Sequence, residues 1–404
     1  MSNRPRSAAN AGRALRALLL SAFLAGCGGG GGSADSSGSG TLGVSLTDAP
    51  ACGFNAVNLT VRQVRVHQSS DASGDAGGWS EITLNPARKI NLLDLTNGVL
   101  EYLGETALPA GHYTQLRLML SPNDASNPFR NSVVRSSVPG AQIALNTPSA
   151  VQTGIKLVHG FDVPAGGRMD LVLDFDACKS VVALGNGGFL LKPVVKAIPS
   201  TFNGIRGFVH ASLLGGNVMV SAQTNGTIVR ATVPDMSTGA FVLARLDAGH
   251  YDVVLTADGR ATAVVNAVPV ESSGVVAIST EADPIVLPVS ATRTISGNAI
   301  LNPPGAADEA VVVAAKQTFG GIPTVTVQWQ AADLLTGAYA LTLPVGAPLL
   351  GTYLVGGALP IPLDPQVALA GQYTVEASAS GYQTQSISRD MSAADVIQDF
   401  ALVP

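Results

Sequence analysis

The chain has 404 residues, of which only 13% are charged and 46% are hydrophobic, and its net charge is −5. Disordered segments are richer in charge and poorer in hydrophobic residues, so the composition excludes a disordered chain. The absence of a basic excess excludes the electrostatic footprint of a nucleic-acid-binding protein. The high content of Gly (45) and Pro (24) argues against coiled coils and long helices. The length predicts two or three domains.

The first 26 residues have the pattern of a secretion signal. Four arginines and no acidic residue precede an apolar run at 17–24. This run is shorter than the roughly 20 residues that span a bilayer. It ends in Leu-Ala-Gly-Cys at 24–27, which resembles a bacterial lipobox. The resemblance implies cleavage before Cys27, lipidation of Cys27 and, because Gly28 rather than Asp follows, sorting to the outer membrane. The alternative is an ordinary signal peptide with a chance cysteine.

The residues that follow predict a tether and one disulfide. Segment 27–40 is rich in Gly and Ser and is expected to be a flexible spacer behind the lipidated Cys27. Beyond it the chain has only two cysteines, Cys52 and Cys178. Two thiols in an oxidising compartment predict a disulfide between them, with two buried free thiols as the alternative.

The rest of the chain alternates apolar and polar residues with a period of two, which predicts β-strands. A turn motif, Ala-Gly-x-Tyr, recurs at 110–113, 248–251 and 370–373 before such strands. The glycine suits a tight turn, and the tyrosine places a large ring in the core and a hydroxyl at its rim. Two copies have His before Tyr. Gln372 in the third copy favours a tolerated polar turn residue over a metal or ligand contact.

The spacing of the motif predicts three tandem β-sandwich domains. Their expected limits are 41–200, 201–290 and 291–404, and the third domain carries an insertion near 344–365. The fold class is therefore all-β, behind a signal peptide and a tether.

The second and third domains share further short motifs. Each begins with Ile-x-Gly, at 205–207 and 295–297, and each has Thr-Gly-Ala-aromatic, at 238–241 and 336–339. In these motifs the two domains resemble carboxypeptidase regulatory-like modules. The resemblance implies small transthyretin-like sandwiches with a carbohydrate-binding-like fold, which serve as spacers, binders or accessory domains.

The first domain carries a different series of motifs. They are Leu-Thr-Asp-Ala-Pro at 46–50, Trp79, Leu-Leu-Asp-Leu at 92–95, Ala-Gly-His-Tyr-Thr-Gln-Leu-Arg-Leu at 110–118, Gly-Ile-Lys-Leu at 154–157, Leu-Asp-Phe-Asp at 173–176 and Leu-Lys-Pro-Val at 191–194. In this order they resemble a bacterial lipoprotein family known only as a domain of unknown function. The resemblance implies a β-sandwich and membrane-anchored export, and it brings no catalytic residue.

One strand gathers carboxylates. On a strand over 169–177, Asp170, Asp174 and Asp176 share one face because alternate residues point the same way. Three carboxylates on one face must be solvated, paired with cations or bound to a metal. Calcium, which takes six to eight oxygen ligands, is the candidate ion. The alternative is a solvated outer face with Lys156, Lys179 or Lys192 nearby.

Catalytic motifs are otherwise missing from the sequence. It has no Gly-x-Ser-x-Gly nucleophile motif, and its five histidines lack metal-ligand spacing. Trp79 and Trp329 could stack on sugars if they were exposed, but in a chain with 5% aromatic residues core positions are favoured.

We therefore predict a non-enzymatic lipoprotein of the bacterial cell envelope with a binding or structural role. Its expected contacts are the membrane, through the lipid anchor, and a glycan or an envelope protein, but not nucleic acid. Carbohydrate binding is the more specific version of this prediction. The alternative is a calcium-dependent or carboxylate-based hydrolase centred on Asp170, Asp174 and Asp176.

Overall fold

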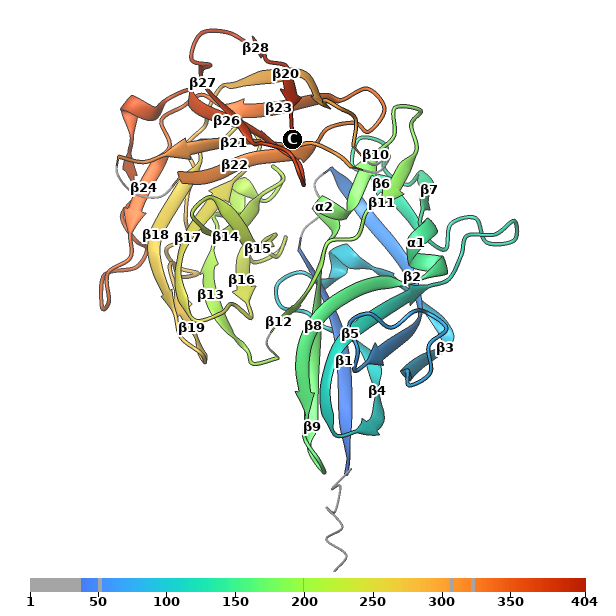
Figure 1. The fold of residues 1–404 in the computed structure, drawn as a ribbon. Helices are drawn as coiled ribbons and strands as arrows, with labels where there is room; N and C mark the ends of the chain where they lie inside the picture. Colours follow the sequence, from blue (N-terminus) through green and yellow to red (C-terminus); the bar gives the residue numbers. More distant parts are fainter. Residues whose placement is uncertain (1–37, 50–52, 199, 306–308, 321–323) are drawn as a thin grey trace, which may run out of the picture. The chain divides into compact units, whose positions relative to one another are not determined.

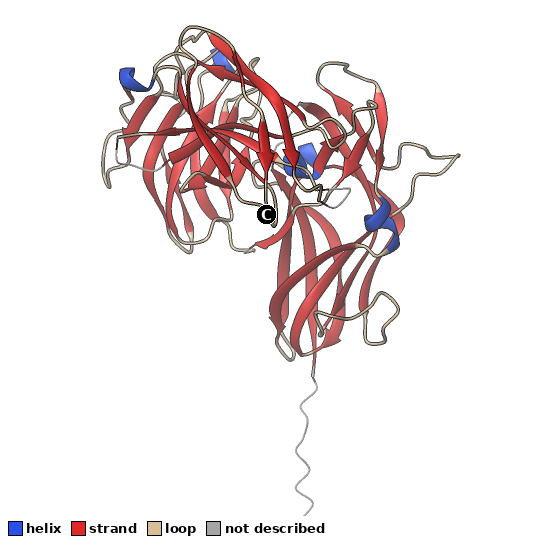
Figure 2. Ribbon diagram, turned by 45° about the horizontal axis from the view of Figure 1, so that its top comes forward, coloured by secondary structure: helices blue, strands red, loops and turns tan. Residues whose placement is uncertain are grey.

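The computed structural model describes residues 38–49, 53–198, 200–305, 309–320 and 324–404. Strands dominate this part of the chain, and the all-β class expected from the sequence is confirmed (Figure 2). The described helical segments are all short: α1 (Pro148–Gln152), α2 (Ala177–Ser180) and the 3-10 turns η1 (Leu92–Leu95), η2 (Ala211–Leu213) and η3 (Val367–Leu369).

The first pair of sheets lies within 39–198 (Figure 1). Leu171, Leu173 and Phe175 of one sheet join Val57 and Leu59 of the other in a single buried core, so the sheets form a sandwich. One sheet has the order β12 (Val195–Ile198), β9 (Arg168–Asp176), β1 (Ser39–Ala49) and β4 (Glu101–Pro109). The other has the order β10 (Val181–Ala183), β11 (Phe189–Leu191), β7 (Gln142–Asn146), β6 (Ser132–Arg135), β2 (Phe54–His67), β5 (Gly111–Leu120) and β8 (Ile155–Val163), with β3 (Ser80–Asn91) also paired to β2.

The second pair of sheets encloses a separate core, to which Ile205, Phe241 and Val253 belong. The smaller sheet has the order β16 (Ala240–Ala244), β13 (Asn203–Phe208) and β19 (Gly274–Ala277). The larger has the order β15 (Thr227–Thr232), β14 (Met219–Thr224), β17 (Gly249–Thr256), β18 (Ala263–Val270), β24 (Leu349–Thr352) and β25 (Asp364–Pro365).

The third pair of sheets encloses the core that contains Ile295, Val313 and Val375. In one sheet β20 (Thr292–Leu301) pairs with β23 (Ala338–Pro344), β28 (Val396–Ile397) and β29 (Phe400–Leu402). The other has the order β22 (Thr324–Ala331), β21 (Val312–Thr318), β26 (Gln372–Ser378) and β27 (Gln385–Asp390).

The second and third pairs of sheets are not independent. Residues 344–365, where the sequence predicts an insertion, contain β24 and β25, which extend the sheet of β17 and β18. Leu349 and Ile361 accordingly lie in the second core, whereas Val254 of β17 and Val264 of β18 lie in the third. All described residues belong to one compact unit, and the three predicted domain limits stay predictions.

The recurring Ala-Gly-x-Tyr motif makes a similar contact in each copy. Tyr113, Tyr251 and Tyr373 are buried. The hydroxyl of Tyr113 donates to the backbone carbonyl of Pro109 at 2.9 Å, and that of Tyr251 donates to the backbone carbonyl of Asp247 at 2.8 Å. The hydroxyl of Tyr373 donates to a carbonyl more distant in sequence, that of Pro344. Burial raises the phenol pKa in each copy. The motif is thus a structural turn.

The Thr-Gly-Ala-aromatic motif is also explained by a turn. Asp235 and Asp333 each precede it, and the Oδ1 atom of each accepts hydrogen bonds from the backbone and hydroxyl of the motif threonine. The next residues, Gly239 and Gly337, both have φ of +71°. A Cβ atom at Gly239 would lie 2.2 Å from a backbone oxygen, so only glycine fits this turn.

The predicted signal peptide and most of the tether, including Cys27, lie outside the described residues, as does Cys52. In the part of the chain that is described, no helix is both long and apolar enough to cross a membrane.

Candidate functional site

Strand β9 carries the acidic face that the sequence singled out. Its apolar residues Leu171, Leu173 and Phe175 are buried in the first core. Its opposite face bears Asp170, Asp174 and Asp176. Strand β9 is hydrogen-bonded to β1 on one side and to β12 on the other. The shared face predicted from the alternation is therefore present, and the surroundings of each carboxylate decide its chemistry.

Asp174 forms a buried ion pair with Arg230 of β15. Its Oδ1 atom lies 2.5 Å from Nη1 of Arg230, and the two side chains are 7% and 8% exposed. Burial raises the pKa of Asp174, and the negative charge of Asp176 adds to this effect. The Arg230 guanidinium and the Lys196 ammonium oppose the rise. The outer face of β9 is thus covered at Asp174, whereas the Asp170 side chain on the same face is 47% exposed.

Asp176 and Asp170 pair with cations close in sequence. The Asp176 carboxylate accepts a hydrogen bond from the backbone N–H of Lys179 at 3.0 Å and lies 2.8 Å from its Nζ atom, so it caps α2. Asp170 pairs with Arg168 at 2.9 Å, and Arg168 also binds Glu105 at 2.6 Å. Each of the three predicted acidic residues therefore has its own cationic partner.

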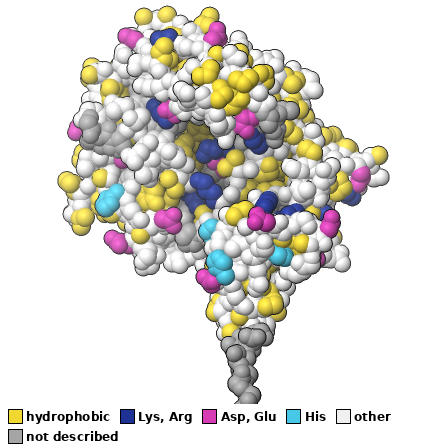
Figure 3. All heavy atoms as spheres, in the orientation of Figure 1, with side chains coloured by type: hydrophobic (Ala, Val, Ile, Leu, Met, Phe, Trp, Pro, Cys, Tyr) yellow, Lys and Arg dark blue, Asp and Glu magenta, His cyan; other side chains and the backbone are white. Residues whose placement is uncertain are grey.

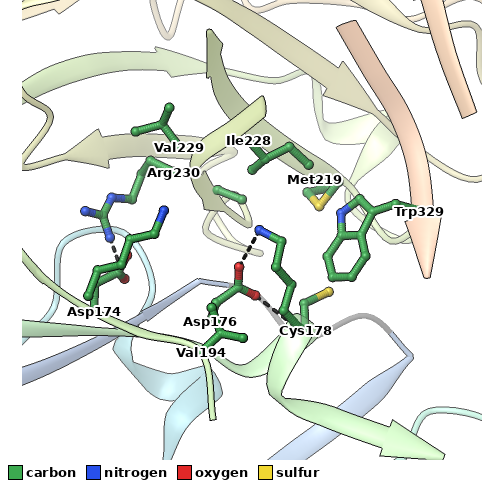
Figure 4. Close-up of a pocket in the computed structure, with 12 residues that line it drawn as sticks. Asp174, Asp176, Cys178, Val194, Met219, Ile228, Val229, Arg230 and Trp329 are labelled. Atoms are coloured by element: carbon green, nitrogen blue, oxygen red, sulfur yellow. Dashed lines mark hydrogen bonds and ion pairs between the residues drawn. The ribbon is translucent and has the colours of Figure 1, made fainter. Parts of the chain in front are cut away.

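A narrow pocket lies where β9, α2, β15 and β22 meet (Figure 4). Asp174, Asp176 and Cys178 line one side, and Arg230 and Trp329 line the other. Trp329 is only 7% exposed, and the Nζ atom of Lys179, which also lines the pocket, lies 5.3 Å from the centre of its ring. On the face of the molecule drawn in Figure 3, Lys and Arg side chains lie in a hollow beside hydrophobic side chains.

The chemistry available in this pocket is limited by its ion pairs. A general acid or base must be able to exchange a proton with a substrate, and a nucleophile needs a base beside it. Asp174 is buried against Arg230, and Asp176 is engaged with the backbone and side chain of Lys179. Among the described residues, no group of three or more His, Cys, Asp or Glu side chains is placed to hold a metal ion. The arrangement is suited to holding strands together.

A second contact joins the turn after η1 to β15 and β16. Asn97, at φ +56°, donates from its amide nitrogen to the Val233 carbonyl at 2.7 Å. Its Oδ1 atom accepts from the Val242 backbone at 3.1 Å and from the Thr232 hydroxyl at 2.8 Å. Next to it, the Gly98 carbonyl accepts from Arg245 at 3.0 Å. One asparagine therefore satisfies polar groups on two strands distant in sequence.

Motif residues between 79 and 117 also make contacts within the chain. The buried Gln115 and Arg117 side chains donate to carbonyls of the 69–72 loop, including that of Ala72. The indole N–H of Trp79 donates to the backbone carbonyl of Ser73, next to this loop, at 3.0 Å. Its ring lies against two guanidinium groups, those of Arg65 and Arg117, at 4.7 and 5.0 Å. Trp79 is half-buried under these side chains, whereas Trp329 is a core residue as expected.

Of the predicted cysteine pair, Cys178 lies in α2 beside the pocket. The Cys52–Cys178 disulfide stays a prediction, because Cys52 lies outside the described residues. Sequence reasoning missed Arg230 and Asn97, the two residues that hold this region together. Neither belongs to a motif, and the only sequence signal for Asn97 is the Asn-Gly pair of a tight turn.

Part of the chain matches a known protein family. Residues 39–193 match the family model of a domain of unknown function, DUF4382, in agreement with the resemblance of the first domain. No curated protein matches the chain. The likeness of the second and third domains to carboxypeptidase regulatory-like modules stays a prediction.

Three solved structures share low identity with the chain. The Bacillus anthracis TIE protein has 11% identity over 90% of this chain, with a TM-score of 0.17, and the chain spans 50% of its length. The major pilin SpaA of Corynebacterium diphtheriae has 12% identity over 90% of this chain and 99% of its own, with a TM-score of 0.19. Two B repeats of the collagen binding protein of Staphylococcus aureus have 12% identity, 90% and 98% coverage and a TM-score of 0.17. Likenesses this weak carry no argument about fold or function.

Proposed function

We propose that the chain is an exported, lipid-anchored protein of the bacterial cell envelope with a non-enzymatic binding or structural role. The observation that supports the non-enzymatic part is the pairing of the acidic residues on β9. Asp174 is buried against Arg230, and Asp176 and Asp170 are held by Lys179 and Arg168. The residues with the strongest sequence claim to chemistry thus bind other parts of the same chain.

The anchor is proposed from the lipobox at 24–27. In the full chain, Cys27→Ser should abolish incorporation of an alkyne-labelled palmitate and shift the protein out of the membrane fraction. Ser33→Ala, in the segment expected to be the tether, is the control and should keep both the label and the membrane association. If Cys27→Ser takes up as much label as the wild type, the lipid anchor is wrong.

Carbohydrate is the proposed ligand class that can be tested most directly. Neither tryptophan presents an open ring for stacking, because Trp329 is buried and Trp79 lies under two guanidinium groups. A sugar would therefore have to be bound by other polar groups. A glycan array probed with the detergent-solubilised full chain tests this version. An array without binding removes carbohydrate and leaves an envelope protein, sought by cross-linking in the intact envelope, as the proposed partner.

A further inference from the structure

A cleft of the described chain is lined by residues from all three pairs of sheets. We call it the mixed cleft, because its lining is both polar and apolar. Its volume of about 800 Å³ lies within the range of roughly 300–1,000 Å³ for sites that bind small molecules. Phe54 at the start of β2, Thr256 at the end of β17 and Thr342 of β23 are among the residues on its walls. The chemistry of this lining decides which class of ligand fits.

Six of the uncharged polar side chains in the lining have no hydrogen-bond partner among the described residues. They are Asn55, Ser136, Thr256, Thr292, Gln328 and Thr342. Gln328 adjoins the buried Trp329, and alternation along β22 turns its side chain to the opposite face of the strand. Thr342 adjoins the buried Leu341 and is turned outward from β23 in the same way. Because hydroxyls and amides both donate and accept, the lining offers hydrogen bonds of both kinds to a ligand.

The charged residues of the described lining are one acid and one base, Asp258 and Arg260. Asp258 accepts a hydrogen bond from the side chain of Asn217 at 2.6 Å. Arg260 donates to the backbone carbonyls of Leu287 and Ser212, both at 3.2 Å. The two charges cancel, and both groups are engaged within the chain. The cleft therefore favours an uncharged ligand, because an ion would lose its water without gaining a free opposite charge.

Apolar side chains make up the other part of the lining. Phe54, Leu93, Met219, Pro234 and Met236 are among them. Met236 is 69% exposed. Methionine side chains are flexible and polarizable, so they adapt to the surface of a ligand. A ligand of this cleft therefore needs apolar surface as well as many hydrogen-bonding groups.

We propose that the mixed cleft binds an uncharged oligosaccharide. A sugar ring carries hydroxyl groups around its rim and C–H groups on its faces. The hydroxyls match the six polar side chains without partners, and the C–H faces match the apolar lining. Binding in this cleft needs no stacking on Trp79 or Trp329, whose rings are not open. The assignment rests on the carbohydrate version of the proposed function and gives it a site.

Variants of the detergent-solubilised full chain test the site on an array of neutral and charged glycans. The pair Gln328→Leu and Thr342→Val removes two hydrogen-bonding groups from the cleft, so it should weaken binding of neutral glycans about tenfold or more. The control pair Gln152→Leu and Thr384→Val makes the same changes at exposed positions outside the cleft. It should bind as the wild type does. Titration with the neutral glycan that gives the strongest array signal measures the fold-change.

Hydrogen exchange of the wild-type chain provides a second measurement that does not depend on any variant. With the same glycan bound, backbone amides at 256–260, which line the cleft, should exchange more slowly. Amides of β27, which lies outside the lining, should be unaffected. Slower exchange only in segments outside the cleft would overturn the assignment.

The array results distinguish failure of the site from failure of the proposed function. If the cleft pair binds neutral glycans as well as the control pair does, the cleft is the wrong site, but carbohydrate binding stands. If only charged glycans bind, the assignment of an uncharged ligand is wrong. An array without binding removes carbohydrate and this site together, and it leaves the non-enzymatic envelope role in place.

Discussion

The buried pair of Asp174 and Arg230 can be tested by removing one partner. Replacing Arg230 with Leu leaves the Asp174 carboxylate buried without its guanidinium. The two side chains are 7% and 8% exposed, so water screens the loss poorly. Breaking such a pair typically destabilises a protein by about 3–5 kcal/mol. Replacing both residues with Leu removes the unpaired charge, so the double variant should be clearly more stable than Arg230→Leu.

The destabilisation caused by Arg230→Leu should also depend on pH. Burial already raises the pKa of Asp174, and removing Arg230 removes a group that opposes the rise. The folded variant then binds a proton more tightly than the unfolded chain, whose Asp pKa is about 3.9. The destabilisation is therefore complete above the folded pKa and shrinks as the pH falls toward the unfolded value.

Urea unfolding of the full chain, followed by tryptophan fluorescence, measures these changes because Trp329 lines the same pocket. Arg168→Leu is the matched control. It breaks exposed ion pairs with Asp170 and Glu105, which water screens well, so it should destabilise the protein far less than Arg230→Leu. The reasoning is refuted if Arg230→Leu costs no more than this control, or if the double variant is as unstable as Arg230→Leu.

Three further predictions concern the pKa of a second buried acid, the metal hypothesis and the cysteines. Burial raises the pKa of Asp252, whose carboxylate accepts from the Ala267 backbone. Asp252→Asn should therefore match or raise the melting temperature at pH 8, and this difference should fade at acidic pH as the wild-type carboxyl takes up its proton. A lower melting temperature at pH 8 would contradict this. Adding calcium or a chelator should leave the melting temperature unchanged, whereas a shift removed by neutralising the three acids of β9 would support the calcium hypothesis. Cys178→Ser should lower stability by about 2–5 kcal/mol if the disulfide forms, and a non-reducing peptide map should contain the linked Cys52–Cys178 peptide.

Local sequence patterns predicted much of the fold. Alternation with a period of two predicted the strand that places Leu173 and Phe175 in the core and Asp174 on the other face. The repeated turn motifs predicted buried tyrosines, because a tight turn followed by a strand places the ring at the same position each time. Strand alternation and turns depend on residues that are close in sequence, so a single sequence is enough to predict them.

The candidate site could be predicted only in part. The sequence marked Asp170, Asp174 and Asp176 as residues that need partners, but the partner of Asp174 belongs to a strand far along the chain. The spacing of the motifs predicts an insertion near 344–365, but nothing in that segment indicated that β24 would join the sheet of β18. Such pairings depend on which surfaces meet when the sheets pack.

The sequence by itself determined the all-β class, the recurring turns and the acidic face of β9. Only the tertiary structure decided that Arg230 pairs with Asp174, that Asn97 satisfies groups on β15 and β16, and that β24 joins the sheet of β18. The physical reason is the range of the interactions. Strand alternation and turn geometry are set within a few residues, whereas ion pairs and sheet edges find partners only after the chain has folded.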